Sequence, residues 1–311
     1  KKTIFFPETW TKTYNLWLKD IRPWCISRQI WWGHQIPIWY GSDGKIFSAK
    51  DQNNAQKQAD KFYKKKNSPI NQDSNVLDTW FSSALWPFAS LGWPKKTYNL
   101  KRFYKTSVLV TGFDILFFWV ARMMMMGLFV TKKVPFDKVY IHALVRDEHG
   151  QKMSKSKGNV IDPLDLINKY GADALRFTLM SMASPGRDVK LSEERVKGYR
   201  NFLTKIWNVS KFCDFNKCNL DIKINNKEVK LEINQWIINE YIHTKNNVDN
   251  HIQNFRFDEA SKAIYNFVWN VFCDWYLEFS KSIFYSDNQN QIKETKKVFG
   301  FIFSNILLTL H

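Results

Sequence analysis

Residues 107–145 read SVLVTGFDILFFWVARMMMMGLFVTKKVPFDKVYIHALV, a long apolar segment between two shorter ones. The runs at 107–112 and 138–145 have the length and composition of strands. In the segment between them we expect a helix that begins near Asp114. A strand, a helix and a second strand in this order form a crossover unit with parallel strands. The stretch therefore indicates an α/β fold.

The central segment, from Phe113 to Val130, is nearly long enough to cross a membrane. Asp114 and Arg122 lie inside it, and charged side chains are costly in lipid. We therefore expect a fully buried core helix rather than a membrane span. Its four consecutive methionines, Met123–Met126, are then flexible core-filling side chains.

The composition indicates a folded chain with an anionic partner. The 311 residues suffice for about two domains, and 44% hydrophobic content allows a sizeable core. A formal net charge of +17 favours nucleic acid as the partner, although a drift toward lysine-rich composition would give the same charge. The four cysteines form no C-x-x-C pair, so we expect neither a zinc site nor disulfides, and a reducing, cytoplasmic setting.

The pattern changes from mixed to helical along the chain, and we expect domains at 1–150, 151–190 and 191–311. Asp162 followed by Pro163 predicts the start of a helix that Gly171 ends. Ser192 can cap a second helix, whose first turn carries two glutamates. Beyond it, apolar residues at helical spacing predict a bundle core formed by Trp236, Ile237, Ile264, Phe267, Val268, Val271, Trp275 and Phe279.

Residues 150–159, GQKMSKSKGN, form what we call the lysine loop. It fails as a Walker A loop, because Lys155 stands where the second glycine must be. Lys152 and Lys155 are nevertheless three apart, two serines add hydroxyl donors, and Gly150 and Gly158 permit sharp turns. The loop also follows the end of a probable parallel strand, where ligands of α/β sheets bind. Polyphosphate binding and an exposed basic loop both fit these residues.

The end of the first strand offers a second candidate site. Gly112 would let a ligand approach the backbone closely, and the Asp114 carboxylate could accept hydrogen bonds from ribose hydroxyls. Asp114 could equally be a plain helix N-cap.

Residues 152–156, KMSKS, are the second signature of class I aminoacyl-tRNA synthetases, and the sequence around them resembles the valyl-tRNA synthetases. The similar stretches are WCISRQIWWGHQIPIWY (24–40), VLDTWFSSALWPFASLGWP (76–94), TSVLVTGFDILFFWVARMMMMGL (106–128), VRDEHGQKMSKSKGNVIDPLDLI (145–167) and YGADALRFTLMSMASPGRDVKLSEERVKGYRNF (170–202). The resemblance implies an α/β and then all-α chain: the second half of a Rossmann nucleotide-binding catalytic domain, a stem-contact region and a helical-bundle anticodon-binding domain.

The resemblance also implies a two-step ligase reaction. Valine attacks ATP, supplied with Mg²⁺, to give valyl-adenylate and pyrophosphate, and the valyl group passes to the 3′ end of tRNA(Val). By match, the catalytic residues are Lys152 and Lys155. The ATP-binding residues are Gly112, Asp114, His142, Met153, Ser154 and Ser156, although Ala143 stands where the family usually has glycine. Trp80 and Ile115 resemble walls of the valine pocket, with generic core packing as the alternative.

Other features of the family do not occur in this sequence. The first signature, His-Ile-Gly-His, and the editing domain are both missing. We therefore expect a C-terminal portion of a synthetase, monomeric, cytoplasmic and free of membrane contact, that is inactive alone. The alternatives are part of an isoleucyl- or leucyl-tRNA synthetase, or a non-catalytic tRNA-binding relative; the intact lysine loop argues against the last.

Overall fold

The computed structural model describes residues 3–186, 188–221, 223–225 and 228–311. The chain divides into two compact units, Lys1–Ile141 and His142–His311. Each unit is described by itself.

A three-stranded sheet forms the centre of the first unit. Its order is β1-β8-β7, and β1 runs parallel to β8. Apolar side chains from the sheet and from the segment after β7 form one buried cluster, which includes Leu109, Leu116, Met123 and Val139. The elements are β1 (Ile4–Phe6), α1 (Thr9–Lys19), β7 (Thr106–Gly112), η1 (Phe113–Ile115), η2 (Leu116–Ala121), α6 (Arg122–Thr131) and β8 (Phe136–His142).

The expected strand–helix–strand order is confirmed, but the helix is not fully buried. In the described residues, one helical stretch, Phe113–Thr131, has the length and hydropathy to cross a membrane, and only 39% of its apolar window is buried. One face packs in the core, whereas Phe118 is 51% and Phe129 is 74% exposed. The expectation of full burial was wrong because the elements that pack against the helix in this unit leave part of its surface exposed. Met123 and Met124 are buried, as expected of core-filling side chains, whereas Met125 and Met126 are only half-buried.

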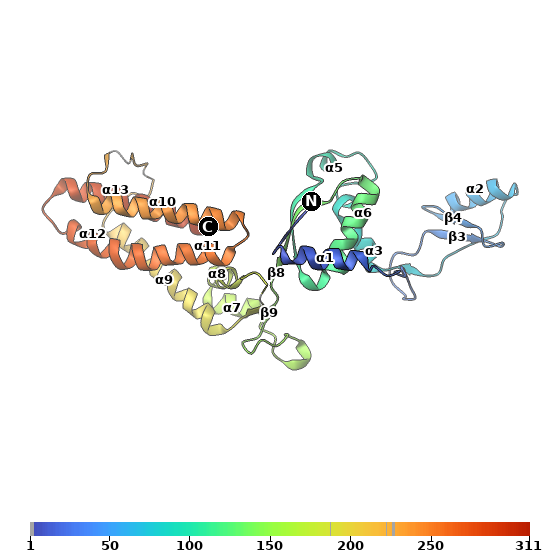
Figure 1. Cartoon of the computed structure of the whole chain (residues 1–311), viewed down its shortest axis with the longest axis horizontal. Helices are drawn as coiled ribbons and strands as arrows, with labels where there is room; N and C mark the ends of the chain where they lie inside the picture. Colours follow the sequence, from blue (N-terminus) through green and yellow to red (C-terminus); the bar gives the residue numbers. More distant parts are fainter. Residues whose placement is uncertain (1–2, 187, 222, 226–227) are drawn as a thin grey trace. The chain divides into compact units, whose positions relative to one another are not determined.

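The rest of the first unit consists of smaller elements. A three-stranded antiparallel sheet, in the order β4-β3-β5, is covered by α2 (Figure 1). Strands β2 and β6 pair antiparallel with Arg28 opposite Val76. The bounds are β2 (Ser27–Arg28), β3 (Ile38–Gly41), β4 (Ile46–Ser48), α2 (Gln52–Tyr63), β5 (Ile70–Gln72), β6 (Val76–Leu77), α3 (Thr79–Ala84), α4 (Trp86–Ala89) and α5 (Tyr98–Phe103).

The second unit begins with short elements and becomes helical. The predicted start at Asp162 is confirmed, because its side chain accepts a hydrogen bond from the Leu164 N–H, and Gly171 ends the helix with φ 92°. Ser192 stands at the start of α9 but makes no capping hydrogen bond. The elements are β9 (Val145–Arg146), η3 (Lys155–Lys157), α7 (Pro163–Tyr170), α8 (Ala172–Met182), β10 (Val189–Lys190) and α9 (Glu193–Phe215).

In the part of the chain that the structure describes, five further helical stretches complete a bundle around one apolar core. Figure 1 shows α10 beside α13 and α11 close by, in agreement with their contacts. The bounds are α10 (Glu232–Gln253), α11 (Phe257–Asn266), η5 (Phe267–Tyr276), α12 (Leu277–Phe284) and α13 (Gln289–Leu310). The predicted core residues Ile237, Ile264, Phe267 and Val268 are buried, and Trp236 and Val271 pack partly against the core.

Two predicted core residues face outward instead. Trp275 is 57% and Phe279 is 45% exposed, and their rings contact each other at 5.7 Å between centroids. The reason is the π-helical stretch η5, in which each turn takes about one residue more than an α-turn. Positions that share a face at α-helical spacing therefore drift away from the core along this stretch.

Candidate active site

The lysine loop begins after a short strand pair in the second unit. Strand β9 runs parallel to β10, with Val145 opposite Val189 and Arg146 opposite Lys190. The side chain of Arg146, at the end of β9, forms an ion pair with Asp188, the residue before β10, and so joins the two strands. The expected strand 138–145 is thus divided: β8 ends at His142, and β9 belongs to a separate sheet. A parallel strand, β9, still precedes the lysine loop, but a turn at residues 147–150 separates the strand from the loop.

That turn is held by Asp147. Its carboxylate oxygen Oδ1 accepts from the Gln151 N–H at 2.7 Å, and its backbone oxygen accepts from the Gly150 N–H at 2.9 Å. Gly150 has φ 80°, a left-handed conformation that glycine adopts without a steric penalty. Arg146 and Lys152 then form an antiparallel bridge, so the first lysine of the signature leaves the turn from an ordered backbone.

Asn159 closes the loop on itself. Its Nδ2 donates to Asp147 Oδ2 at 2.8 Å and to the Lys152 carbonyl oxygen at 3.3 Å, and its Oδ1 accepts from the Ser154 N–H at 3.0 Å. The Asn159 amide holds the pKa of the Asp147 carboxyl below its usual range, since it stabilises the charged form. One side chain from beyond the signature therefore joins the Asp147 turn before it to Lys152 and Ser154 within it.

The side chains of the signature, residues 152–156, differ in their exposure to solvent. Lys152 and Ser156 are exposed, and Met153 and Ser154 are partly buried. The Ser154 and Ser156 hydroxyl oxygens lie 3.2 Å apart. The side chain of Lys155 lies outside what the structure describes; its backbone begins the 3₁₀ turn Lys155–Lys157. The loop thus presents cationic and hydroxyl groups on an ordered backbone, as a polyphosphate site requires.

In the first unit, Gly112 and Asp114 stand at the end of β7. Gly112 is buried and is the residue before the 3₁₀ turn Phe113–Ile115, and no side chain caps that turn. Asp114 is exposed within the turn. The alternative that Asp114 is a plain N-cap is therefore contradicted.

Trp80 lies in the first turn of α3 and is half-buried. Its backbone N–H donates to the Asp78 carboxylate at 2.7 Å, and its ring packs on that of Phe118 with centroids 6.0 Å apart. Phe118 follows Ile115 by three residues, so the two predicted pocket walls belong to neighbouring segments of the unit. Ile115 is itself half-buried.

His142 ends β8 and is exposed. Its Nδ1 lies 2.8 Å from the carbonyl oxygen of Ala143, the residue at which this chain departs from the family's usual pattern. His142 belongs with the lysine loop to the second unit, whereas Gly112, Asp114, Ile115 and Trp80 belong to the first.

The residues that sequence reasoning missed are Asp147, Asn159, Asp78 and Arg28. Asn159 stood inside the quoted loop, and an asparagine beside a glycine is a turn signal that could have drawn attention to it. Asp78 precedes a short helix, the position of an N-cap. Nothing in the local sequence indicated their partners, which lie 12 and 50 residues away.

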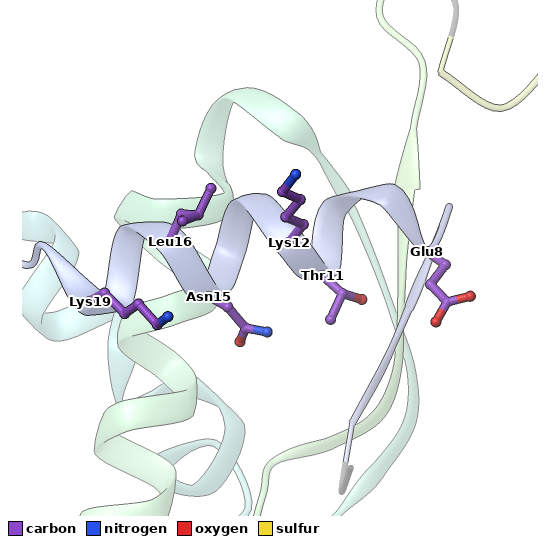
Figure 2. A pocket seen from close by; sticks show the side chains of 6 residues that line it. All are labelled: Glu8, Thr11, Lys12, Asn15, Leu16 and Lys19. Carbon is purple, nitrogen blue, oxygen red and sulfur yellow. The ribbon is translucent and has the colours of Figure 1, made fainter.

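A hollow of about 490 Å³ lies along α1 and contains none of the predicted site residues. Figure 2 shows that the side chains lining it are spaced along one helix instead of gathering around a centre. They are Glu8, Thr11, Lys12, Asn15, Leu16 and Lys19. We assign it no role in the site.

Comparison with protein families matches residues 1–192 to the tRNA synthetases class I (I, L, M and V). The chain belongs to this family. Residues 234–311 match the anticodon-binding domain of tRNA ligases. The class I synthetase fold, an α/β catalytic part followed by helices, is thereby established for this chain.

Similar proteins cover the whole chain but are much longer. The chain is 59% identical to the Valine–tRNA ligase of Pelagibacter ubique over 312 aligned residues, which include 100% of this chain and 35% of that protein. It is 54% identical to the Valine–tRNA ligase of Brucella suis, again over 100% of this chain and 34% of that protein. The chain therefore spans about a third of the length of these relatives.

Solved structures of class I synthetases share the fold. LeuRS of Agrobacterium radiobacter, in a ternary complex with tRNA and LeuAMS, matches with a TM-score of 0.73 and 18% identity, over 97% of this chain and 42% of that chain. Methionyl-tRNA synthetase of Mycobacterium tuberculosis, in complex with methionyl-adenylate, matches with a TM-score of 0.73 and 16% identity, over 99% of this chain and 54% of that chain.

For a class I synthetase, these groups fit activation chemistry without a covalent enzyme intermediate. Fixed cations and N–H donors can stabilise charge that develops on a leaving phosphate. No group of three or more metal-ligating side chains occurs in the described ranges.

Proposed function

We propose that this chain supplies the lysine-loop part of the active site of a valine–tRNA ligase. The supporting observation is 59% identity to a Valine–tRNA ligase along the entire chain, with KMSKS intact. In the proposed reaction a valine carboxylate oxygen attacks the α-phosphate of ATP. Pyrophosphate leaves, and the valyl group then passes from the adenylate to the 3′-terminal adenosine of tRNA(Val).

In this proposal the lysine loop stabilises the leaving pyrophosphate. Lys152 and Lys155 are its catalytic cations, and Ser154, Ser156 and the backbone near Met153 contact the ATP phosphates. Mg²⁺ enters with ATP as part of the substrate. The ordered backbone fits this role, because donors that are already oriented need no rearrangement when charge develops.

The remaining predicted residues take the other parts of the substrates. Gly112 and Asp114 contact the ribose of ATP; the exposed Asp114 carboxylate, which caps no helix, fits this role. His142 lies near the adenine. Trp80 and Ile115 form walls of the valine pocket, and their half-buried side chains leave surface available for a ligand.

We further propose the division into a catalytic part (1–150), the lysine loop with the stem-contact region (151–190) and an anticodon-binding part (191–311). The +17 charge supports contact with tRNA phosphates. The protein would function as a monomer in the cytoplasm without membrane contact. Binding of tRNA(Val) should weaken steeply as salt rises from about 50 to 200 mM; a flat salt profile would assign the charge to another partner.

The test is ATP–pyrophosphate exchange on the complete gene product, with each amino acid offered in turn. We expect exchange with valine and weak exchange with threonine, since a hydrophobic pocket rejects that isostere by only about 10²-fold, the discrimination already known for valyl-tRNA synthetases. Lys155→Ala should lower the exchange rate by orders of magnitude and leave tRNA affinity nearly unchanged. Lys157→Ala, in the same loop but outside the signature, is the matched control.

The outcome separates the alternatives. Exchange with isoleucine or leucine alone would assign the chain to those synthetases and remove the valine role of Trp80 and Ile115. Tight tRNA binding with no exchange for any amino acid would indicate a non-catalytic tRNA-binding relative. Equal activity of Lys155→Ala and Lys157→Ala would remove the phosphate role of the signature.

A further inference from the structure

A charged cluster lies beside Trp80 in the first unit. It consists of Arg28 on β2, Asp78 before α3 and Arg122 at the start of α6. Asp78 is 5% and Arg122 is 8% exposed, so two of the three charges are buried. Buried charges require partners, and a cluster of this kind is expensive unless its geometry is well defined.

Asp78 joins two chain segments through its carboxylate. Oδ1 accepts from the Trp80 N–H at 2.7 Å, and Oδ2 accepts from the guanidinium of Arg28. Arg28 Nη1 also donates to the carbonyl oxygens of Cys25, at 2.7 Å, and Ser27, at 2.8 Å. The first turn of α3, which carries Trp80, is thereby fixed to the segment 25–28.

Arg122 contacts the aromatic ring on which Trp80 packs. Its guanidinium lies 3.4 Å from the centroid of the Trp24 ring and 5.6 Å from that of Phe118. Phe118 is the residue on which the Trp80 ring packs. Cation–π contact at these distances is favourable, more so when desolvated. The ring of Trp80 is thus supported by a side chain that Arg122 itself contacts.

The cluster carries two positive charges and one negative charge. Burial lowers the pKa of Arg122, and the nearby charge of Asp78 opposes that effect. Among the described residues, Arg122 Nη1 is a buried nitrogen without a hydrogen-bond partner. Asp78 is therefore the group on which both arginines depend, because its loss would leave two nearby cations uncompensated.

We propose that Asp78, Arg28 and Arg122 are positioning residues that hold Trp80 in the wall of the amino-acid pocket and so set the selectivity for a small branched aliphatic amino acid. The inference rests on the proposed function and on the role of Trp80 in it. A hydrophobic pocket distinguishes amino acids that differ by one methylene by only about 10–200-fold. Discrimination by excluded volume needs a wall that does not move, and the cluster fixes the backbone of Trp80 and the support of its ring.

The main test is Asp78→Asn in the complete protein. Asparagine retains the Oδ1 acceptor for the Trp80 N–H and nearly the same volume, but it removes the charge. In ATP–pyrophosphate exchange we expect the KM for valine to rise at least tenfold and the valine-over-isoleucine ratio of kcat/KM to fall at least tenfold. The KM for ATP should stay within about twofold. Arg28→Lys, which keeps the charge, should lie closer to wild type than Arg28→Gln.

The matched control is Asp137→Asn, which breaks an exposed ion pair with Lys105 in the same unit. It should leave every kinetic constant unchanged. Equal increases of the KM for valine and for ATP in Asp78→Asn would indicate a general structural effect and overturn the proposal. Unchanged selectivity in Asp78→Asn would overturn it as well.

A second readout separates this inference from the proposed function. Absence of valine-dependent exchange in the wild-type protein would refute the function itself. Hydrogen exchange of residues 79–84, measured by mass spectrometry, does not require activity. Faster exchange in Asp78→Asn than in Asp137→Asn supports the positioning of Trp80. Equal hydrogen exchange in the two variants refutes it, whichever amino acid the enzyme activates.

Discussion

Replacing Asn159 by alanine should release the lysine loop while leaving the rest of the second unit intact. The Asn159 side chain makes three hydrogen bonds, to Asp147, to the Lys152 carbonyl and from the Ser154 N–H. These contacts join residues on both sides of the signature. Alanine retains none of them and creates no new contact.

The expected size of the effect follows from the number of bonds. A typical intramolecular hydrogen bond contributes about 1 kcal/mol net. Three such bonds amount to roughly 3 kcal/mol, and about 1.4 kcal/mol corresponds to a tenfold change in an equilibrium constant. The opening equilibrium of the loop should therefore shift by about 100-fold in Asn159→Ala.

Hydrogen exchange detected by mass spectrometry on peptides covering 151–159 measures this shift. Protection should fall by about 100-fold there and remain unchanged in α9 and α10. Asn216→Ala is the matched control: Asn216 is also half-buried, and its amide donates to the Phe212 carbonyl at 2.9 Å, away from the loop. The rate of ATP–pyrophosphate exchange should fall in Asn159→Ala and not in the control.

A charge substitution at the same position adds a sharper test. Asn159→Asp keeps an acceptor for the Ser154 N–H but places a second carboxylate against Asp147. Two carboxylates at this distance repel, and the pKa of one of them rises. The aspartate variant should be less protected than Asn159→Ala at pH 7 and should recover on acidification to about pH 4–5. Equal protection of wild type and Asn159→Ala would refute the role assigned to this side chain.

Three further outcomes are expected. The pKa of the Asp147 carboxyl is lower in the folded loop than in the unfolded chain, where it is about 3.9. Its contribution to loop order is therefore present above the unfolded pKa and is lost as pH falls through the lower folded pKa. Protection factors of the loop, measured from pH 6 to pH 2.5, should show this loss. Tyr276→Phe leaves the buried Oδ1 of Asn234 without its 2.8 Å donor and should lower the free energy of unfolding by about 1–3 kcal/mol in urea titrations. Gly300→Ala should lower the free energy of unfolding by about 1–3 kcal/mol, since the added methyl group would lie 2.8 Å from the backbone carbonyl carbon of Asn219. Gly198→Ala places its methyl group in open space and should not lower that free energy.

Local patterns predicted much of the fold. The strand at 107–112, the helical segment after it and the cap formed by Asp162, Pro163 and Gly171 all depend on residues close in sequence. Each is decided by hydrophobic spacing or by the chemistry of one turn. The structure reproduces them for that reason.

The errors arose where the outcome depends on more distant parts of the chain. The spacing of Trp275 and Phe279 fits the core face of an α-helix, but the π-helical stretch before and around them changes that face. The helix after Gly112 has enough apolar residues for complete burial, yet burial depends on the number of elements that pack against it. Neither feature can be read from the periodicity of one segment.

The residues of the candidate site also differ in whether local sequence reveals them. The KMSKS signature is contiguous, so its lysines and serines are visible in the sequence. The side chains that hold the site in place are not contiguous with it. Asp147 meets Asn159 across 12 residues, and Arg28 meets Asp78 across 50. Hydrogen-bonded side-chain pairs of this kind leave no periodic pattern, because polar and charged residues at arbitrary separation occur by chance throughout a chain with 46 basic and 29 acidic residues. A sequence can therefore identify the groups that contact a substrate more readily than the groups that position them, and the variants at Asn159 and Asp78 test the positioning groups directly.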